Sequence, residues 1–87
     1  MDVEGHIEYM FHPPTYLNKL LVAKADSLEL WNIKSDTKIH TFANIKVEGR
    51  VSFIAESPLV DIVAIGSSRG EILVVNLRAD EVLISLS

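Results

Sequence analysis

Cysteine is absent from this 87-residue sequence. The chain therefore has no disulfide, no thiolate nucleophile and no zinc site built from cysteine. This composition is compatible with a cytosolic or nuclear protein, because disulfides are rare in those compartments.

Long hydrophobic segments are also absent. The longest apolar runs, such as Ile62–Ile65 and Ile72–Val75, are far too short to cross a bilayer. The segment Met1–Gly5 is acidic and lacks the apolar core of a signal peptide. We therefore expect no membrane partner.

Positive charge is scarce and scattered. The formal net charge is −4, from eight Lys and Arg residues against twelve Asp and Glu residues. Nucleic-acid surfaces bind phosphates through clustered Lys and Arg side chains, and no window of the sequence holds such a cluster. We expect no direct contact with nucleic acid.

Catalytic and metal-binding motifs are missing as well. His6, His12 and His40 fall in separate segments without the spacing of a metal site. Gly66–Gly70 lacks the Gly-Lys-Ser/Thr ending of a phosphate-binding loop, and Ser67 within it lacks the context of a serine nucleophile. We predict no enzyme, no catalytic residue, no cofactor and no metal.

The sequence does contain an internal repeat. Gly5–Tyr9 aligns with Gly49–Phe53, and Leu28–Lys34 aligns with Ile72–Arg78, so that the period is 44 residues at both ends of the unit. Four short apolar segments within a unit of 40–45 residues are typical of a β-propeller blade. We predict two units, residues 1–44 and 45–87, which together form an incomplete propeller or a fragment of one.

Each unit contains four candidate strands and no convincing helix. Apolar and polar residues alternate over short runs, and clusters of Pro, Asp, Ser and Gly separate them. The fold class predicted is all-β, with two four-stranded antiparallel blades; a compact eight-strand sandwich or barrel is the alternative. The expected strands span residues 6–11, 18–24, 27–33, 37–42, 50–55, 60–66, 71–77 and 81–86.

Several positions resemble WD40 repeats. Trp31-Asn32 resembles the Trp-Asp dipeptide that ends a WD40 strand, Gly5-His6 resembles the Gly-His dipeptide, and Gly66–Ile72 is similar to the second hairpin. The resemblance implies WD40-type blades. It gives these structural repeat positions: Gly5, His6, Trp31, Asn32, Gly49, Ser67, Gly70 and Asn76.

One WD-repeat family is closer than the others. His12–Val22, followed by Leu28–Ile33 and His40–Phe42, resembles the tandem-propeller WD-repeat proteins of the small-subunit processome, which are associated with U3 small nucleolar RNA. Asp61–Gly66 and Asn76–Arg78 are similar to the next repeat of that family. The run Pro-Thr-Tyr-Leu-Asn-Lys within the first segment is far more specific than a Trp-Asp dipeptide.

The resemblance implies a non-catalytic scaffold for protein interactions in processome assembly and maturation of the 18S ribosomal RNA. The partners implied are protein subunits of a U3 ribonucleoprotein complex, and the location implied is the nucleus and nucleolus. A generic WD40 adaptor in another complex, for ubiquitin ligation or trafficking, stays open as the alternative.

The sequence departs from the WD40 pattern in the Asp-His-Ser-Trp network that braces many blades. Lys24 lies near the serine position of the first unit, and Arg50 and Val75 replace the histidine and tryptophan of the second. We therefore expect both blades to be less rigid than a blade with the consensus network. Trp31 is expected to pack between blades, with an anchor at a protein interface as the alternative.

Two blades leave two apolar faces uncovered, because propellers close with about four to eight blades. We expect the chain to associate with itself through these faces or to be completed by a longer parent protein. Three basic residues at turns are expected to be exposed and to contact partners: Lys24, Arg50 and Arg69.

Overall fold

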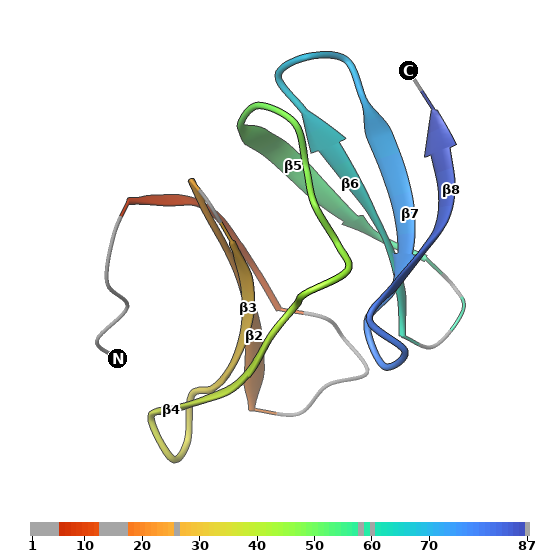
Figure 1. Cartoon of the computed structure of the whole chain (residues 1–87). Helices are drawn as coiled ribbons and strands as arrows, with labels where there is room; N and C mark the ends of the chain where they lie inside the picture. The colour runs from red at the N-terminus through yellow and green to blue at the C-terminus, as the bar shows by residue number, and fades with distance from the viewer. Residues whose placement is uncertain (1–5, 13–17, 26, 58, 60, 87) are drawn as a thin grey trace.

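The computed structural model describes residues 6–12, 18–25, 27–57, 59 and 61–86. They form eight strands in two four-stranded antiparallel sheets, which stand side by side and are joined by the linker 42–50 (Figure 1). The strands are β1 (Ile7–Phe11), β2 (Lys19–Lys24), β3 (Leu28–Asn32), β4 (Thr37–Thr41), β5 (Val51–Glu56), β6 (Ile62–Ser67), β7 (Ile72–Asn76) and β8 (Glu81–Leu86).

The predicted all-β class is confirmed. Within each sheet, every strand pairs with its neighbour in sequence, in the order β1-β2-β3-β4 and β5-β6-β7-β8. This simple meander is the strand order of a propeller blade. No strand of the described part pairs across the two sheets, so the alternative of one closed barrel is wrong.

The internal repeat extends to irregularities of the backbone. A register shift flanks Glu8 in β1, and an equivalent one flanks Ser52 in β5, 44 residues later. Asp36 and Asp80, also 44 residues apart, both adopt a positive φ in the turns that precede β4 and β8. A shared bulge and a shared strained turn indicate that both sheets are built on one plan.

The main hydrophobic core lies between the two sheets. Side chains alternate along a strand, so that cross-strand partners share a face. Leu21 pairs with Leu30 on one sheet and Ile65 with Leu73 on the other, and all four are buried in one cluster. Phe42, from the linker, is buried in the same cluster. Burial of each such side chain contributes about 1.5–3 kcal/mol.

The outer face of the second sheet is apolar and largely uncovered. Gly66 pairs with Phe53 and with Ile72, which places the last two side chains on the face opposite the core. A Cβ atom at Gly66 would overlap the Phe53 ring, so this ring lies directly over the glycine. Four large hydrophobic side chains on this face are exposed: Phe53, Ile72, Ile84 and Leu86.

The described residues contain no helix, as expected. In consequence, no helix in this part of the chain is long and apolar enough to cross a membrane. Each of the eight predicted strands is present, with bounds that differ from the expected ones by at most two residues.

Candidate functional site

Asp80, in the turn between β7 and β8, connects the second sheet to the linker. Its carboxylate accepts hydrogen bonds from the backbone amides of Ala43 (2.9 Å) and Asn44 (3.1 Å) in the linker. Nε2 of His40 lies 3.1 Å from Oδ2 of the same carboxylate. Asp80 therefore connects the turn between β7 and β8 to the end of β4 and to the linker.

Glu8 connects the first sheet to the start of β5 in the second. This residue lies at the bulge of β1, and its buried carboxylate accepts a hydrogen bond from the amide of Val51 at the start of β5 (2.9 Å). Its second oxygen is 3.8 Å from Nε of Arg50. Asp80 and Glu8 thus connect the two sheets through bonds to backbone amides. Strand β1 also contacts β5.

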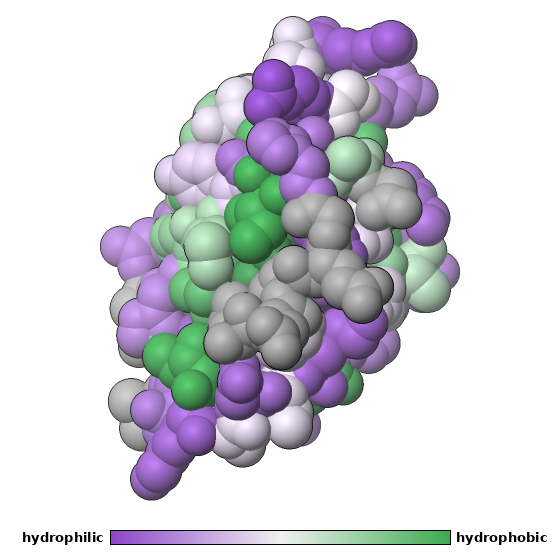
Figure 2. All heavy atoms as spheres, turned by 90° about the vertical axis from the view of Figure 1, so that its left-hand side faces the viewer, coloured by the Kyte–Doolittle hydropathy of each residue, from purple (hydrophilic) through white to green (hydrophobic). Residues whose placement is uncertain are grey.

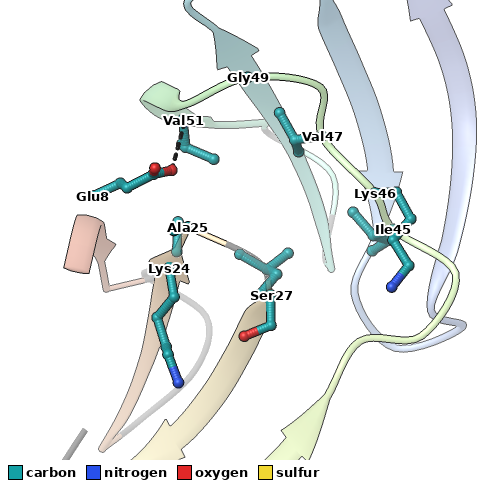
Figure 3. Close-up of a pocket in the computed structure, with 11 residues that line it drawn as sticks. Glu8, Lys24, Ala25, Ser27, Ile45, Lys46, Val47, Gly49 and Val51 are labelled. Atoms are coloured by element: carbon teal, nitrogen blue, oxygen red, sulfur yellow. Dashed lines mark hydrogen bonds between the residues drawn. The ribbon is translucent and has the colours of Figure 1, made fainter. Parts of the chain in front are cut away.

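A pocket of about 80 Å³ lies between these sheets, where the linker passes the turn between β2 and β3. In Figure 3, Val47 and Val51 lie on one side of this space, and Ala25 and Ser27 lie on the other. We call it the junction pocket. Its apolar wall consists of Ala23, Ala25, Leu28, Ile45, Val47 and Val51.

A second polar cluster lies on the outer face of the first sheet. The indole N–H of Trp31 donates to Oε1 of Glu29 at 2.9 Å, and Lys24 donates to Oε2 at 3.3 Å. Nζ of Lys38 is 3.5 Å from the same oxygen. Glu29 and Trp31 share a face because they are two residues apart on β3. We call these four residues the Glu29 cluster.

The Glu29 cluster lies in an apolar surrounding. Cross-strand pairing places Leu20 beside Trp31 and Val22 beside Glu29, on the face opposite the core. Figure 2 views the molecule from this side, and hydrophobic atoms gather in the middle of the face with hydrophilic atoms above and below. Burial of a carboxylate among such groups is costly unless cations and hydrogen-bond donors satisfy it, and this cluster supplies both.

The surroundings of Glu29 and of Asp80 lower the pKa of both carboxyl groups. Burial by itself raises the pKa of Glu29, but the hydrogen bonds from Trp31 and Lys24 and the charges of Lys24 and Lys38 outweigh it, so that the pKa is lowered. Burial also raises the pKa of Asp80, and the bonds from Ala43, His40 and Asn44 then lower it below its usual value. Both groups are held as carboxylates at neutral pH.

Acidification is expected to weaken the fold through these two groups. Their pKa values are lower in the folded chain than in the unfolded chain, so the unfolded chain binds more protons at low pH. The stability that they contribute is complete above about pH 5 and is lost as the pH falls through their folded pKa values. Urea unfolding between pH 3 and 7 measures this loss, and the double variant Glu29→Gln and Asp80→Asn should show a flatter profile.

Removal of the Asp80 carboxylate is expected to loosen the linker. Glycine tolerates the positive φ of this position, so Asp80→Gly removes the three contacts without adding backbone strain. We expect a loss of about 2 kcal/mol in the free energy of unfolding and faster hydrogen exchange at the amides of Ala43 and Asn44. Asp80→Asn, which keeps one acceptor oxygen, should lose less. Unchanged exchange at both amides in the glycine variant would contradict this role of Asp80.

Two of the predicted repeat positions, Asn32 and Asn76, lie where a strand passes into a turn. Asn32 accepts hydrogen bonds from Lys34 and Ser35, and Asn76 accepts one from Ala79, so both cap the turns that follow their strands. These are turns in which an Asn side chain replaces a backbone acceptor.

The remaining repeat positions lie near the hairpins and the linker. Gly70 and Gly49 both adopt a positive φ, and a Cβ at Gly49 would also crowd Ser68 and Arg69. The hydroxyl of Ser67 accepts bonds from the amides of Arg69 and Glu71 in the turn before β7. Of the Gly-His pair, His6 is exposed, and Gly5 lies outside the described residues.

Trp31 does not pack between the two sheets. It is 9% exposed and lies on the outer face of the first sheet, outside the core cluster that both sheets share. The alternation of strand side chains is the reason, because Leu28 and Leu30 occupy the inner face of the same strand. Only a further blade on that outer face would place Trp31 between blades.

One of the three proposed contact residues is not exposed. The Lys24 side chain is only 15% exposed, since its ammonium group is paired with Glu29 and its stem lines the junction pocket, so the expectation of an exposed Lys24 was wrong. Arg50 is 71% exposed, and Arg69 is also exposed. Glu8, Glu29 and Asp80 were not singled out as contact residues between segments.

No group of three or more His, Cys, Asp or Glu side chains in the described part of the chain is placed to hold a metal ion. The arrangement offers instead a pocket with apolar walls, exposed arginines beside it and an exposed apolar sheet face. These are features through which proteins contact other proteins.

The sequence matches a known protein family over its whole length. The profile described as "WDR36/Utp21 first beta-propeller" matches residues 1–87. The chain belongs to the WDR36/Utp21 first β-propeller family. WD40-type blades therefore account for both sheets, as the resemblance implied.

Individual WDR36/Utp21 proteins support this assignment. WD repeat-containing protein 36 of Homo sapiens is 41% identical over 78 residues, which are 88% of this chain and 8% of that protein. The U3 small nucleolar RNA-associated protein 21 homolog of Schizosaccharomyces pombe is 32% identical over 83 residues, which are 94% of this chain and 9% of that protein. U3 small nucleolar RNA-associated protein 21 of Saccharomyces cerevisiae is 30% identical over 74 residues, which are 85% of this chain and 8% of that protein. The chain thus spans less than a tenth of the length of these relatives.

Proposed function

We propose that this chain is part of a non-catalytic scaffold for protein interactions, which acts in assembly of the small-subunit processome and in maturation of the 18S ribosomal RNA. The match of the whole chain to the WDR36/Utp21 family carries this proposal, together with the names of two relatives as U3 small nucleolar RNA-associated proteins. The partners proposed are protein subunits of a U3 ribonucleoprotein complex, and the location proposed is the nucleolus.

The physical features of the chain agree with a scaffold. The net charge of −4 disfavours direct binding of RNA phosphates, whereas exposed loops on rigid sheets are a usual place for protein contacts. The turn that contains Arg69 and the linker around Arg50 provide such loops beside the junction pocket. We propose that residues 1–44 and 45–87 form two blades, and that these loops lie where the two blades meet.

Affinity purification tests the function directly. A tagged protein that contains this chain is purified from cells, and U3 small nucleolar RNA and its proteins are quantified against a tagged unrelated WD40 protein. Enrichment of the U3 particle, and accumulation of unprocessed 18S precursors after depletion of the protein, would support the proposal. Enrichment of ubiquitin ligase or trafficking complexes without U3 would contradict it and favour a generic adaptor.

Self-association of the isolated chain is a further part of the proposal. The exposed face formed by Phe53, Ile72, Ile84 and Leu86 leaves apolar surface in water. Three or four copies would provide six or eight blades, which is within the range of closed propellers. Light scattering during size-exclusion chromatography should give a mass of three or four times 9.7 kDa. The double variant Ile84→Lys and Leu86→Lys should be monomeric, and a monodisperse monomer of the unmodified chain would overturn this idea.

A further inference from the structure

Strand β8 forms one edge of the second sheet. In the order β5-β6-β7-β8, its only partner among the described strands is β7, and Figure 1 shows it at the margin of that sheet. Five of its six residues are exposed. An edge strand presents a row of backbone N–H and C=O groups with which a further strand can pair. The second sheet therefore offers β8 as a place where a strand can be added.

The side chains of β8 do not protect this edge, in contrast to those of β4. Natural edge strands avoid unwanted pairing by means of charged side chains, above all lysine. Strand β4 is the equivalent edge of the first sheet, and it carries Lys38 and His40. Strand β8 carries only Glu81, at its first position, and continues as Val-Leu-Ile-Ser-Leu. Both strands contain a bulge, at Ile39 and at Leu83, so the bulge does not distinguish them, whereas the missing lysine does.

The register of β8 determines which side chains an added strand would meet. Ile84 and Leu86 lie on the exposed apolar face, whereas Ser85 between them pairs with Leu73 of the core. Side chains directly opposite each other on neighbouring strands interact, and opposite charges placed there are favourable. A matching strand therefore has aliphatic side chains beside Ile84 and Leu86, a small polar side chain beside Ser85, and a basic residue near Glu81.

We propose that β8 binds an extended segment of a partner protein by strand addition, and that this segment alternates aliphatic with small hydroxyl side chains and has a basic residue near Glu81. Backbone hydrogen bonds supply the affinity, and the side chains beside Ile84 and Leu86 supply the specificity. The occupant is a strand because it continues the ladder that β7 and β8 already form. The inference rests on the proposed scaffold function, because it names the kind of segment that the scaffold binds.

The first test uses the 87-residue chain and two fluorescent peptides. One has the sequence Lys-Ile-Thr-Val-Thr-Ile-Lys with blocked ends, and the other carries N-methyl groups on its five central residues. The second peptide keeps every side chain but lacks the backbone donors of a strand. We expect it to bind at least about tenfold more weakly in fluorescence anisotropy, since each lost hydrogen bond weakens binding. Equal affinity of the two peptides, or no binding of the unmethylated one, would overturn the inference.

Hydrogen exchange locates the added strand. We expect amides within Val82–Leu86 to exchange more slowly when the unmethylated peptide is present, because new hydrogen bonds cover the edge of β8, and amides of β4 to be unchanged. Protection in β4 instead of β8 would contradict the proposal. Protection of the β8 amides without peptide, increasing with the concentration of the chain, would also overturn it, because the edge would then belong to a second copy of this chain.

A matched pair of variants tests the role of charge at the edge. Ser85→Lys gives β8 a lysine of the kind that protects β4, and it should weaken binding of the unmethylated peptide about three- to tenfold. Thr41→Lys places the same side chain at the equivalent exposed position of β4 and should leave the affinity unchanged. Equal effects of the two substitutions would show that the peptide does not bind at β8. These results are independent of the proposed function, because a protein that does not bind the peptide can still co-purify with the U3 particle.

Discussion

Phe42→Ala is expected to reduce the free energy of unfolding by about 3–5 kcal/mol. The Phe42 side chain is 2% exposed and lies in the core that both sheets share, so that its removal leaves a cavity against each of them. A chain of this size has a total stability of only about 4–13 kcal/mol at usual values per residue. Urea unfolding monitored by circular dichroism measures the loss.

Phe53→Ala is the matched control for this change. The same side chain is truncated, but Phe53 is 41% exposed and lies on the outer face of the second sheet. We expect a loss of about 1 kcal/mol or less, because much of the ring already contacts water. Equal losses for the two variants would show that Phe42 does not join the sheets.

Glu29→Ala is expected to cost about 2–4 kcal/mol. The substitution leaves the mostly buried ammonium group of Lys24 and the indole N–H of Trp31 without their acceptor. A cation without a partner in an apolar surrounding is costly, which accounts for most of the expected loss. The only tryptophan in the chain reports the change, since its fluorescence should shift when the bond to Glu29 is lost.

Two further variants identify the cause of this loss. Glu29→Gln keeps a carbonyl oxygen for Trp31 but removes the charge that pairs with Lys24, so its cost should be intermediate. Glu56→Ala removes an exposed carboxylate from β5 and should change stability by less than about 0.5 kcal/mol. If Glu29→Ala and Glu56→Ala were equally stable, the Glu29 cluster would contribute nothing to folding.

The repeat and the strands could be predicted because each rests on local chemistry. Alternation of apolar and polar residues indicates strands, and turn residues mark their ends. The contacts of Asp80 are an example of what local patterns do not predict. Asp80 lies in the turn between β7 and β8 with a positive φ, a conformation that Asp tolerates in turns. Its bonds to Ala43 and Asn44 join segments far apart in sequence, and no local pattern signals them.

The candidate site was less predictable than the fold. Arg50 and Arg69 were expected at exposed turns and are exposed, but Lys24 is paired and largely covered. The spacing of Glu29 and Trp31 was a usable signal, because residues two apart on a strand share a face. The strand prediction therefore places the two side chains side by side, whereas the burial of the carboxylate and its bond to the indole N–H depend on packing. The second partner, Lys24, comes from a neighbouring strand and depends on register.

The sequence by itself determined the strands, the turns, the period of 44 residues and the family, since all of these depend on residue types at fixed spacings. The tertiary structure decided which face of each sheet forms the core, which face of β3 holds Trp31, and how Glu8 and Asp80 join the two sheets. It also placed the junction pocket beside Arg50 and Arg69. The physical reason is that these contacts join residues distant in the chain, so they exist only once the strands are paired in register and the sheets have packed.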